Sequence, residues 1–473
     1  MPKARQRRAT GARKAALTWI DENAEALCEL SDGIWRFAEP AFQEHESAAL
    51  LADAVEAGGL TVERGVAGMP SAFLASYGSG KPVVGILAEY DALPGLSQKP
   101  VPHKDPLVEG GCGHGCGHNL LGVGSTGAVM AVSTALARTG ARGTIELFGC
   151  PAEEGGSGKA YMVREGLFED VDIVLHWHPG SRSRAMCYGT LAVNRAKFRF
   201  HGLSSHAAGG PEQGRSALDA VELMNVGVNY LREHTPEKSR LHYIITGGGE
   251  RPNIVPDFAE SWYYVRAPNM QDVQEIWERV LDIARGAALM TRTEHEVGDI
   301  NGSYDVLPND SLARVVDRQL RRIGPPVFTE DEMVFGRELR EAVANDGGRE
   351  RGASEKDGVS PLDADISPIE HGHHAGSTDV GDVSWTVPTG GVSVAARVRG
   401  TPGHSWPCTA TSGMSIGHKG MLVAAKVLCA TALELLSKPE LVAAAKEEFA
   451  KQTEQLTYNS PIPAGQPPPE RLD

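Results

Sequence analysis

The chain has 473 residues, a net charge of −15, a hydrophobic share of 41% and a charged share of 23%. This length exceeds what one ordinary hydrophobic core supports, and the composition is close to the globular average, which excludes a disordered chain and favours two domains. Because nucleic acids and anionic membranes bind basic patches, the acidic balance also argues against both as partners.

Targeting and redox signals are weak. The first residues, MPKARQRR, are basic, but no apolar signal segment follows them, so we interpret the run as a solvated tail. We expect no membrane-spanning segment, because no apolar run approaches the necessary length. The seven cysteines are odd in number and scattered, which argues against a disulfide framework. The sequence therefore predicts a cytoplasmic protein.

The first part of the chain alternates helices with strands. After an amphipathic helix at 15–30, each predicted strand follows or precedes a segment of helical periodicity. This alternation indicates an α/β layer with a mostly parallel sheet. Helices are predicted at 45–60, 122–139 and 158–168, and strands at 81–94, 143–154 and 171–180.

The pattern changes at residue 192. Alternating segments typical of antiparallel strands follow, at 194–202, 240–249 and 257–268, with helices at 216–234 and 273–291. A strand at 390–398 and a helix at 420–436 then resume the first domain, and the Pro-rich tail at 459–473 is predicted to be extended. We expect a catalytic domain formed by 1–191 and 306–473, an inserted α+β domain at 192–305, and a polar surface loop at 344–365.

The segment GVGSTG, residues 122–127, fits the GxGxxG pattern of dinucleotide-binding proteins. That pattern requires a strand directly before it, whereas a Cys/His loop precedes it here. The favoured interpretation is that these glycines allow a helix to pack closely beneath the sheet.

A Cys-Gly-His unit occurs twice in GGCGHGCGHNLLG, residues 110–122. The repeat could be a redox pair, a zinc knuckle or half of a catalytic metal site. Cys116 and His118 are two residues apart, so a thiolate and an imidazole could bind one divalent ion. A structural zinc site would need two further ligands nearby, whereas a catalytic site recruits ligands from the ends of several strands.

Four groups follow or end predicted structure elements and could supply those ligands. Glu153 and Glu154 are adjacent and point in different directions, so one could bind metal while the other acts as a general base; two acids favoured at a helix N-terminus are the alternative. His176 and His178 fall on one face of a strand end. The four groups are Glu89 with Asp91, Glu153 with Glu154, His176 with His178, and His404 in a Gly/Pro loop.

These residues belong to a series of motifs that resembles the M20 metallopeptidases, in particular the amidohydrolase branch with hippurate, indole-acetyl-amino-acid and p-aminobenzoyl-glutamate hydrolases. The resemblance covers nearly the whole chain and keeps the family order. Its motifs are AEPAFQEHES, EYDALPG, GHGCGHNLLG, PAEEGGSGK, HWHPG, HGLSSHAA, RPNIVPDFAESWYYVR, GSTDVGDVSW and GTPGHSWPCTATSGMSIGHKGM.

The resemblance implies a di-metal catalytic domain with an inserted dimerisation, or lid, domain. Cys116 would be the thiolate that bridges two divalent ions, Mn²⁺ or Zn²⁺, and Glu153 would be the general base. His178 is preferred to its rival His176 because the His-Pro form matches this branch. The implied ligands are Cys116, His118, Glu154, His178 and His404.

Some positions depart from the family pattern or have no implied role. Asn119 stands where relatives usually have Asp, and the acidic pair upstream begins with Glu89 where Asp is commoner; both changes would affect support of the site. Cys112 and His114, in the first Cys-Gly-His unit, would shape the pocket wall or only pack.

The inserted domain contributes a second set of residues through the resemblance. His206 would reach across a homodimer and stabilise the oxyanion in the partner's site. Asn253 and Arg266 would hold the substrate carboxylate, a task for which the guanidinium fork is suited.

The predicted function is hydrolysis of the amide bond of an N-acyl or N-aroyl amino acid, such as p-aminobenzoyl-glutamate or an indole-acetyl-amino acid, by metal-activated water. Two alternatives remain: a dipeptidase of the same fold, and a non-catalytic binding or regulatory subunit. Besides a homodimer, a hetero-partner of a second chain type is considered.

Overall fold

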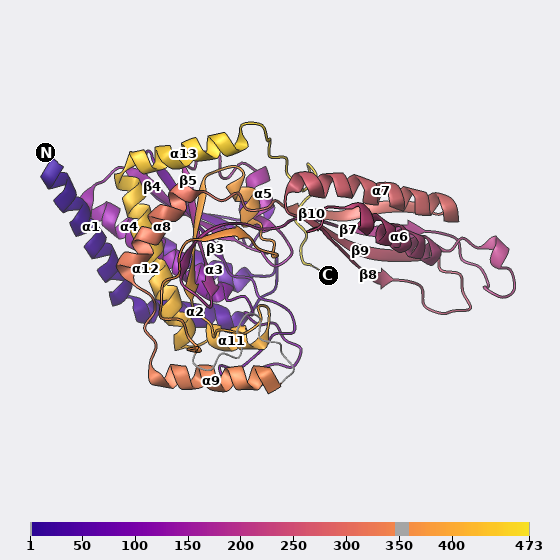
Figure 1. The fold of residues 1–473 in the computed structure, drawn as a ribbon, viewed down its shortest axis with the longest axis horizontal. Helices are drawn as coiled ribbons and strands as arrows, with labels where there is room; N and C mark the ends of the chain where they lie inside the picture. Colours follow the sequence, from indigo (N-terminus) through magenta and orange to yellow (C-terminus); the bar gives the residue numbers. More distant parts are fainter. Residues whose placement is uncertain (1, 346–358, 473) are drawn as a thin grey trace.

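Residues 2–345 and 359–472 are described in the computed structural model (Figure 1). An eight-stranded sheet with the order β1-β2-β4-β3-β5-β12-β6-β11 forms the main body. Its four inner strands, β4, β3, β5 and β12, are parallel, while β1, β2 and β6 join antiparallel. The strands are β1 (Thr61–Arg64), β2 (Phe73–Ser79), β3 (Val83–Glu89), β4 (Gly143–Cys150), β5 (Ile173–Gly180), β6 (Arg184–Gly189), β11 (Glu370–His373) and β12 (Thr389–Ala395).

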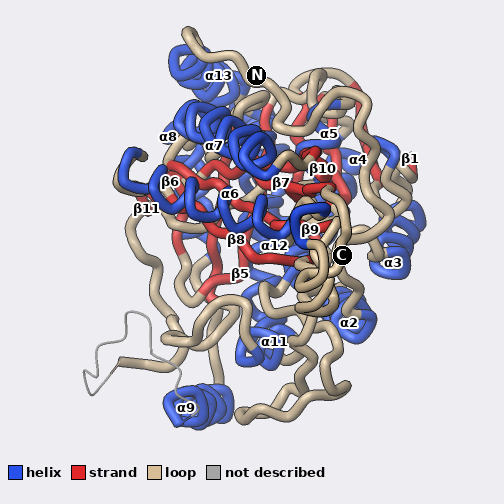
Figure 2. Tube along the Cα trace, turned by 90° about the vertical axis from the view of Figure 1, so that its right-hand side faces the viewer, coloured by secondary structure: helices blue, strands red, loops and turns tan. Residues whose placement is uncertain are grey.

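Helices cover both faces of this sheet, which confirms the predicted α/β class (Figures 1 and 2). The helices α4 and α12 pack together in the largest core, with α1 and α8 beside them, and α5 and α10 lie in a second core. The helices of the main body are α1 (Pro2–Glu22), α2 (Ala24–Phe37), α3 (His45–Ala57), α4 (His118–Thr139), α5 (Gly158–Arg164), α8 (Asp310–Ile323), α9 (Glu330–Asn345), α10 (Val380–Ser384), α11 (Trp406–Ser412), α12 (Ser415–Ser437) and α13 (Pro439–Thr453).

The glycines of GVGSTG lie inside α4, as the packing interpretation predicts. A Cβ atom on Gly124 would come within 2.9 Å of the Trp177 ring nitrogen, and one on Gly122 within 2.7 Å of the Glu89 carbonyl oxygen. These positions therefore allow α4 to approach β3 and β5, and they leave no room for a dinucleotide.

The structure corrects two points: the premise that no apolar run is long enough to span a membrane, and the separate N-terminal tail. Both α4 and α12 are long and apolar enough to cross a membrane by length and composition, contrary to the expectation that no segment is. The most apolar stretches of α4 and α12 are 83% and 72% buried inside the protein, which is typical of core helices. The basic run at the N-terminus is not a separate tail, because residues 2–10 are continuous with the helix α1.

A second, four-stranded antiparallel sheet projects from the main body (Figure 1). Its order is β10-β7-β9-β8, and α6 and α7 cover one of its faces around a separate core. This sheet is the predicted inserted α+β domain. Its elements are β7 (Ala192–His201), α6 (Ala217–Leu231), β8 (Arg240–Gly247), β9 (Phe258–Ala267), α7 (Met270–Thr291) and β10 (Glu294–Ser303).

The sequence analysis missed several strands at the sheet edges. β10 contains EHEVGDINGS, whose charged, Asn and Gly residues have low strand propensity, and its register shifts between Gly298 and Asn301. β11 has only four residues. The surface loop predicted at 344–365 falls largely on residues 346–358, which lie outside the described part of the chain.

Candidate metal centre

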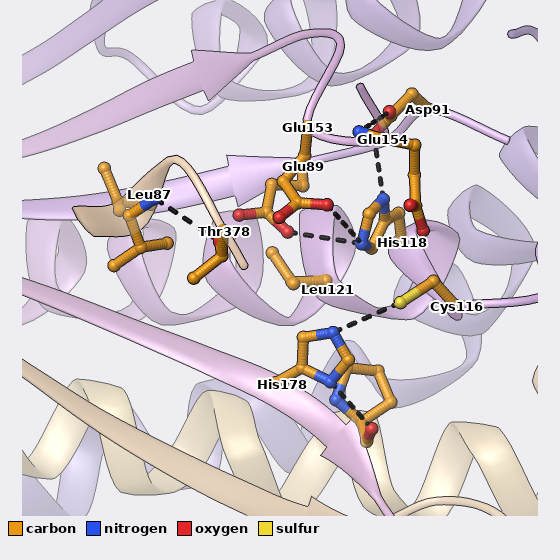
Figure 3. Close-up of polar contacts among 12 residues, drawn as sticks. Leu87, Glu89, Asp91, Cys116, His118, Leu121, Glu153, Glu154, His178 and Thr378 are labelled. Atoms are coloured by element: carbon orange, nitrogen blue, oxygen red, sulfur yellow. Dashed lines mark hydrogen bonds and ion pairs between the residues drawn. The ribbon is translucent and has the colours of Figure 1, made fainter. Parts of the chain in front are cut away.

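The carboxyl ends of the parallel strands meet at one edge of the main sheet, and most of the predicted metal ligands and the predicted base gather there (Figure 3). Glu89 ends β3, Glu153 and Glu154 follow β4, and His178 lies near the end of β5. His118 is the first residue of α4. A cavity of about 750 Å³ opens at this edge and extends to the inserted domain.

Cys116 lies between two groups of ligand atoms. Its sulfur is 3.3 Å from Nε2 of His178, and the ligand atoms of Cys116, His118 and His178 all lie within 4.8 Å of one another. The same limit holds for Cys116, Glu154 and His404. The structure thus brings five distant sequence positions into two sets of three that share one sulfur.

The hydrogen bonds of His118 leave one ring nitrogen for a metal. Nδ1 is 2.8 Å from Oδ1 of Asp91, and because a carboxylate only accepts, Nδ1 carries the proton. Nε2 is fully buried and has no hydrogen-bond partner among the described residues, although Glu89 and Glu153 carboxylate oxygens lie 3.3 and 4.0 Å away. Thiolate, imidazole and carboxylate donors fit divalent zinc or manganese ions.

His178 and His176 differ in their surroundings. His178 Nδ1 donates to the Pro179 carbonyl at 2.9 Å, which directs Nε2 toward Cys116. His176 belongs to none of the potential ligand groups among the described residues, and burial lowers its pKa to about 4. The geometry therefore favours His178 over its rival.

The loop after β4 fixes the directions of Glu153 and Glu154. Ala152 has a left-handed φ of +58°, and its N–H donates to the buried carboxylate of Glu44 at 2.8 Å. Glu154 N–H donates to Asp91 Oδ2 at 2.8 Å, while its side chain lies 3.1 Å from His404 Nε2. Glu154 thus faces Cys116, and Glu153 faces Glu89 and His118 (Figure 3).

Negative charge dominates the centre. Burial would raise the pKa of Cys116, but the His178 and His118 imidazoles lower it well below its usual value. Burial, followed by the charges of Glu89 and Glu154, holds the pKa of Glu153 well above its usual value. Burial and the Cys116 charge raise the pKa of Glu154 to about 7. Bound cations would offset this crowding.

A buried lysine behind the centre was not identified from the sequence. Lys159 Nζ lies 2.7 Å from Glu89 and 2.6 Å from Asp379, and its backbone N–H donates to the second Asp379 oxygen at 2.9 Å. Lys159 therefore places one positive charge between the buried carboxylates of Glu89 and Asp379. Lys159 is part of the motif PAEEGGSGK, and Asp379 is part of GSTDVGDVSW. The resemblance of these motifs to the family could therefore have identified both residues as candidates.

The first Cys-Gly-His unit is separate from the centre. His114 is fully buried, contacts the Ile34 carbonyl oxygen through Nε2 at 3.0 Å, and has a pKa lowered to about 4 by burial. Cys112 belongs to no potential ligand group among the described residues. Asn119 donates to Ser31 and Ser412 and so joins α4 to neighbouring helices.

The lining of the cavity is rich in arginine. Arg266 donates to Ser377 Oγ at 2.9 Å and lies over the Tyr264 ring, and Arg195 lies over the same ring from β7. Within the described residues, neither Arg266 nor Arg195 forms an ion pair with a carboxylate. Five arginines line the cavity: Arg182, Arg184, Arg195, Arg266 and Arg397.

His206 and Asn253 do not line this cavity. Ala192 pairs with Ala267 beside the main body, whereas His201 pairs with Phe258 at the far end of the inserted sheet. His206 follows that far end and is exposed. Within one chain, the structure brings Arg266 to the site but leaves His206 and Asn253 distant from it.

Comparisons with known proteins give the family. The model of peptidase family M20/M25/M40 matches residues 85–355. The chain is 41% identical to one of the subunits of the Escherichia coli K12 p-aminobenzoyl-glutamate hydrolase, over 94% of this chain and 96% of that protein. It is 30% identical to a mouse Xaa-Arg dipeptidase, over 94% of each.

Solved structures share the fold. An aminobenzoyl-glutamate utilization protein from Klebsiella pneumoniae aligns with a TM-score of 0.63 at 18% identity, covering 88% of this chain and 97% of its own. A dinuclear metal binding peptidase of the M20 family from Bacillus subtilis aligns with a TM-score of 0.55 at 16% identity, covering 88% and 99%.

Proposed function

Because the chain belongs to the M20 peptidase family of metal-dependent hydrolases, we propose that it hydrolyses the amide bond of an N-aroyl or N-acyl amino acid whose amino-acid part is acidic. The observation that carries this proposal is the cavity itself. Its lining includes both thiolate, imidazole and carboxylate ligands and five arginines, of which Arg195 and Arg266 come from the inserted domain.

Two metal ions are proposed at the two ligand groups that share Cys116. Cys116, His118 and His178 would hold one ion, and Cys116, Glu154 and His404 the other. Bound there, divalent ions polarise an amide carbonyl and lower the pKa of water.

Glu153 is proposed as the general base. Its carboxylate forms a third close group with Glu89 and His118 and belongs to neither group that contains Cys116. From that place it would accept the proton of the attacking water and return it to the leaving amine nitrogen. A binding subunit without catalysis would have no use for a base at this position, which argues against that alternative.

The arginines support an anionic substrate. Arg266 and Arg195 both lie over the Tyr264 ring and have no carboxylate partner among the described residues, so they can bind a substrate carboxylate. The same arginines argue against a dipeptide with a C-terminal arginine, the substrate named for the mouse relative, because like charges would meet. A glutamate or aspartate amide is therefore the preferred substrate.

A homodimer is proposed to complete the site with His206 from the partner. β8 is an edge strand of the inserted sheet, and the exposed apolar residues beside it are typical of an interface. These are Val226 and Tyr230 on α6 and Ile244 and Ile245 on β8, with 50%, 76%, 58% and 46% of their surface exposed. Because two different Escherichia coli relatives are each named as a subunit of p-aminobenzoyl-glutamate hydrolase, a hetero-partner is the alternative.

The seven free cysteines suit the reducing cytoplasm that we propose as the location.

The test is a panel of amides assayed with the metal-loaded enzyme. We expect the highest kcat/KM for p-aminobenzoyl-glutamate or another aroyl-glutamate, and lower values for benzoyl-glycine and for a dipeptide ending in arginine. Arg266→Ala should raise KM for the glutamate substrate by roughly tenfold to a hundredfold, the value of a charged hydrogen bond, and change hydrolysis of the matching glutamate diamide little. Preference for the arginine dipeptide would contradict the proposal.

A further inference from the structure

A second group of potential metal ligands lies beside β6, on the face of that strand that points away from the catalytic cavity. The sulfur of Cys187 on β6, a carboxylate oxygen of Asp310 at the start of α8 and an imidazole nitrogen of His371 on β11 all lie within 4.8 Å of one another. β6 and β11 form the end of the main sheet, and α8 packs against β6 (Figure 2).

The strand geometry separates this group from the catalytic cavity. Arg184, Met186 and Tyr188 of β6 line the cavity, and because side chains alternate along a strand, Cys187 points to the other face. The parallel pairing of β11 with β6 places His371 directly opposite Cys187. One face of β6 therefore lines the catalytic cavity, and Cys187 and His371 lie on the other face of the two strands.

The three side chains are available to a cation. Neither the Cys187 thiol nor the His371 ring makes a hydrogen bond to a described residue, and Asp310 uses only Oδ2, which accepts from Arg314 at 2.6 Å. Both oxygens of Glu448 accept from the backbone N–H groups of Asp310 and Ser311, which adds negative charge close by.

Their chemistry favours zinc. Thiolate with imidazole and carboxylate is a ligand set that zinc prefers, while magnesium and calcium prefer oxygen alone. Zinc ligands lie about 2.0–2.3 Å from the ion, so the three atoms would have to move together by roughly 1 Å. Rotation of the exposed His371 side chain can supply most of that movement.

We propose that Cys187, Asp310 and His371 form a zinc site, distinct from the catalytic centre, that fixes the edge strand β11 to β6 and α8. The segment directly after β11 lines the cavity from His374 to Asp379, including the Ser377 partner of Arg266. Zinc at this site would hold that part of the substrate wall in place.

The first test compares zinc content between variants. Full-length chains are loaded with Zn²⁺, dialysed against metal-free buffer and analysed for metal. Cys187→Ala and His371→Ala should each hold one zinc ion fewer per chain than the wild type. Two matched controls, Cys429→Ala for a buried cysteine outside any ligand group and His373→Ala for the next histidine on the same face of β11, should match the wild type. Equal zinc content in Cys187→Ala and the wild type would overturn the proposal.

A second test keeps Cys187 in place and removes the cysteine of the catalytic centre instead, so its decisive variant does not depend on how Cys187→Ala folds. Cobalt bound by a thiolate gives a charge-transfer absorption. In Cys116→Ala, which removes the bridging sulfur of the catalytic centre, this absorption should persist after Co²⁺ loading and disappear in Cys116→Ala/Cys187→Ala. Its absence from Cys116→Ala would overturn the zinc site and leave the proposed function untouched.

Discussion

His178 and His176 alternate with Trp177 on β5, yet only His178 comes within reach of Cys116. His178→Ala should therefore lower metal content by up to one ion per chain and abolish most activity, because it removes one of three proposed ligands. His176→Ala should keep the wild-type metal content. Elemental analysis after dialysis measures both, and metal loss in His176→Ala alone would exchange the two assignments.

Glu153 and Glu154 are adjacent, but replacing each by glutamine should have a different effect on catalysis and on metal binding. Glu153→Gln should retain metal and lower kcat by roughly 10²- to 10⁴-fold, because an amide cannot accept the proton of water. Glu154→Gln should lower metal occupancy first. Metal content must be measured beside the rate, and a metal-free Glu153→Gln enzyme would contradict its role as the base.

The sequence indicated those candidate residues whose type and spacing are by themselves typical of metal sites. Cys116, His118 and the Glu153–Glu154 pair were recognisable because their types and spacing are unusual outside metal sites. Lys159 and Asp379 lie in two of the quoted motifs, but their ion pair was not predicted, because they are 220 positions apart and only the fold brings them together. The preference for His178 over His176 came from the His-Pro motif, and the position of His178 beside Cys116 agrees with it.

The helix α5 carries a buried ion pair in its first turn. It begins beside Lys159, whose ammonium group joins Glu89 on β3 to Asp379 in the segment before α10. Lys159→Met should lower the free energy of unfolding by roughly 3–5 kcal/mol, because two buried carboxylates lose their partner. Denaturant titration measures this loss.

The matched control is Lys451→Met, which breaks the exposed pair with Glu447 on α13. We expect no measurable loss of stability there, because water screens exposed ion pairs. Equal stability of Lys159→Met and Lys451→Met would show that the buried pair does not support the site.

The elements that the sequence predicted are those with strong periodicity and many apolar residues, such as α4 and β3. α4 extends four residues further toward its N-terminus than predicted, because the helix begins at His118 in the metal loop. β1, β2, β6, β10 and β11 were missed because edge and hairpin strands are short or polar and gain their order from pairing with distant segments.

At the scale of the whole molecule, the projecting inserted domain places His206 far from the centre of its own chain. If a second copy supplies this residue, His206→Ala should lower kcat by roughly 10²- to 10³-fold with metal content intact. Mixing His206→Ala chains with Glu153→Gln chains should then restore up to about a quarter of wild-type activity, because half of the dimers are hybrids with one intact site of two.

The control for this mixture replaces Glu153→Gln by the double variant Glu153→Gln/His206→Ala, whose chains cannot lend a histidine. No activity should return in that mixture. If the protomers exchange and the first mixture also stays inactive, His206 does not act in the partner's site.

If Cys116 bridges two divalent ions, anomalous diffraction from crystals of the zinc- or manganese-loaded enzyme should show two peaks beside its sulfur. One peak should also lie within bonding distance of His118 and His178, and the other within bonding distance of Glu154 and His404. A single peak, or a pair of peaks that does not include Cys116, would contradict this bridging role.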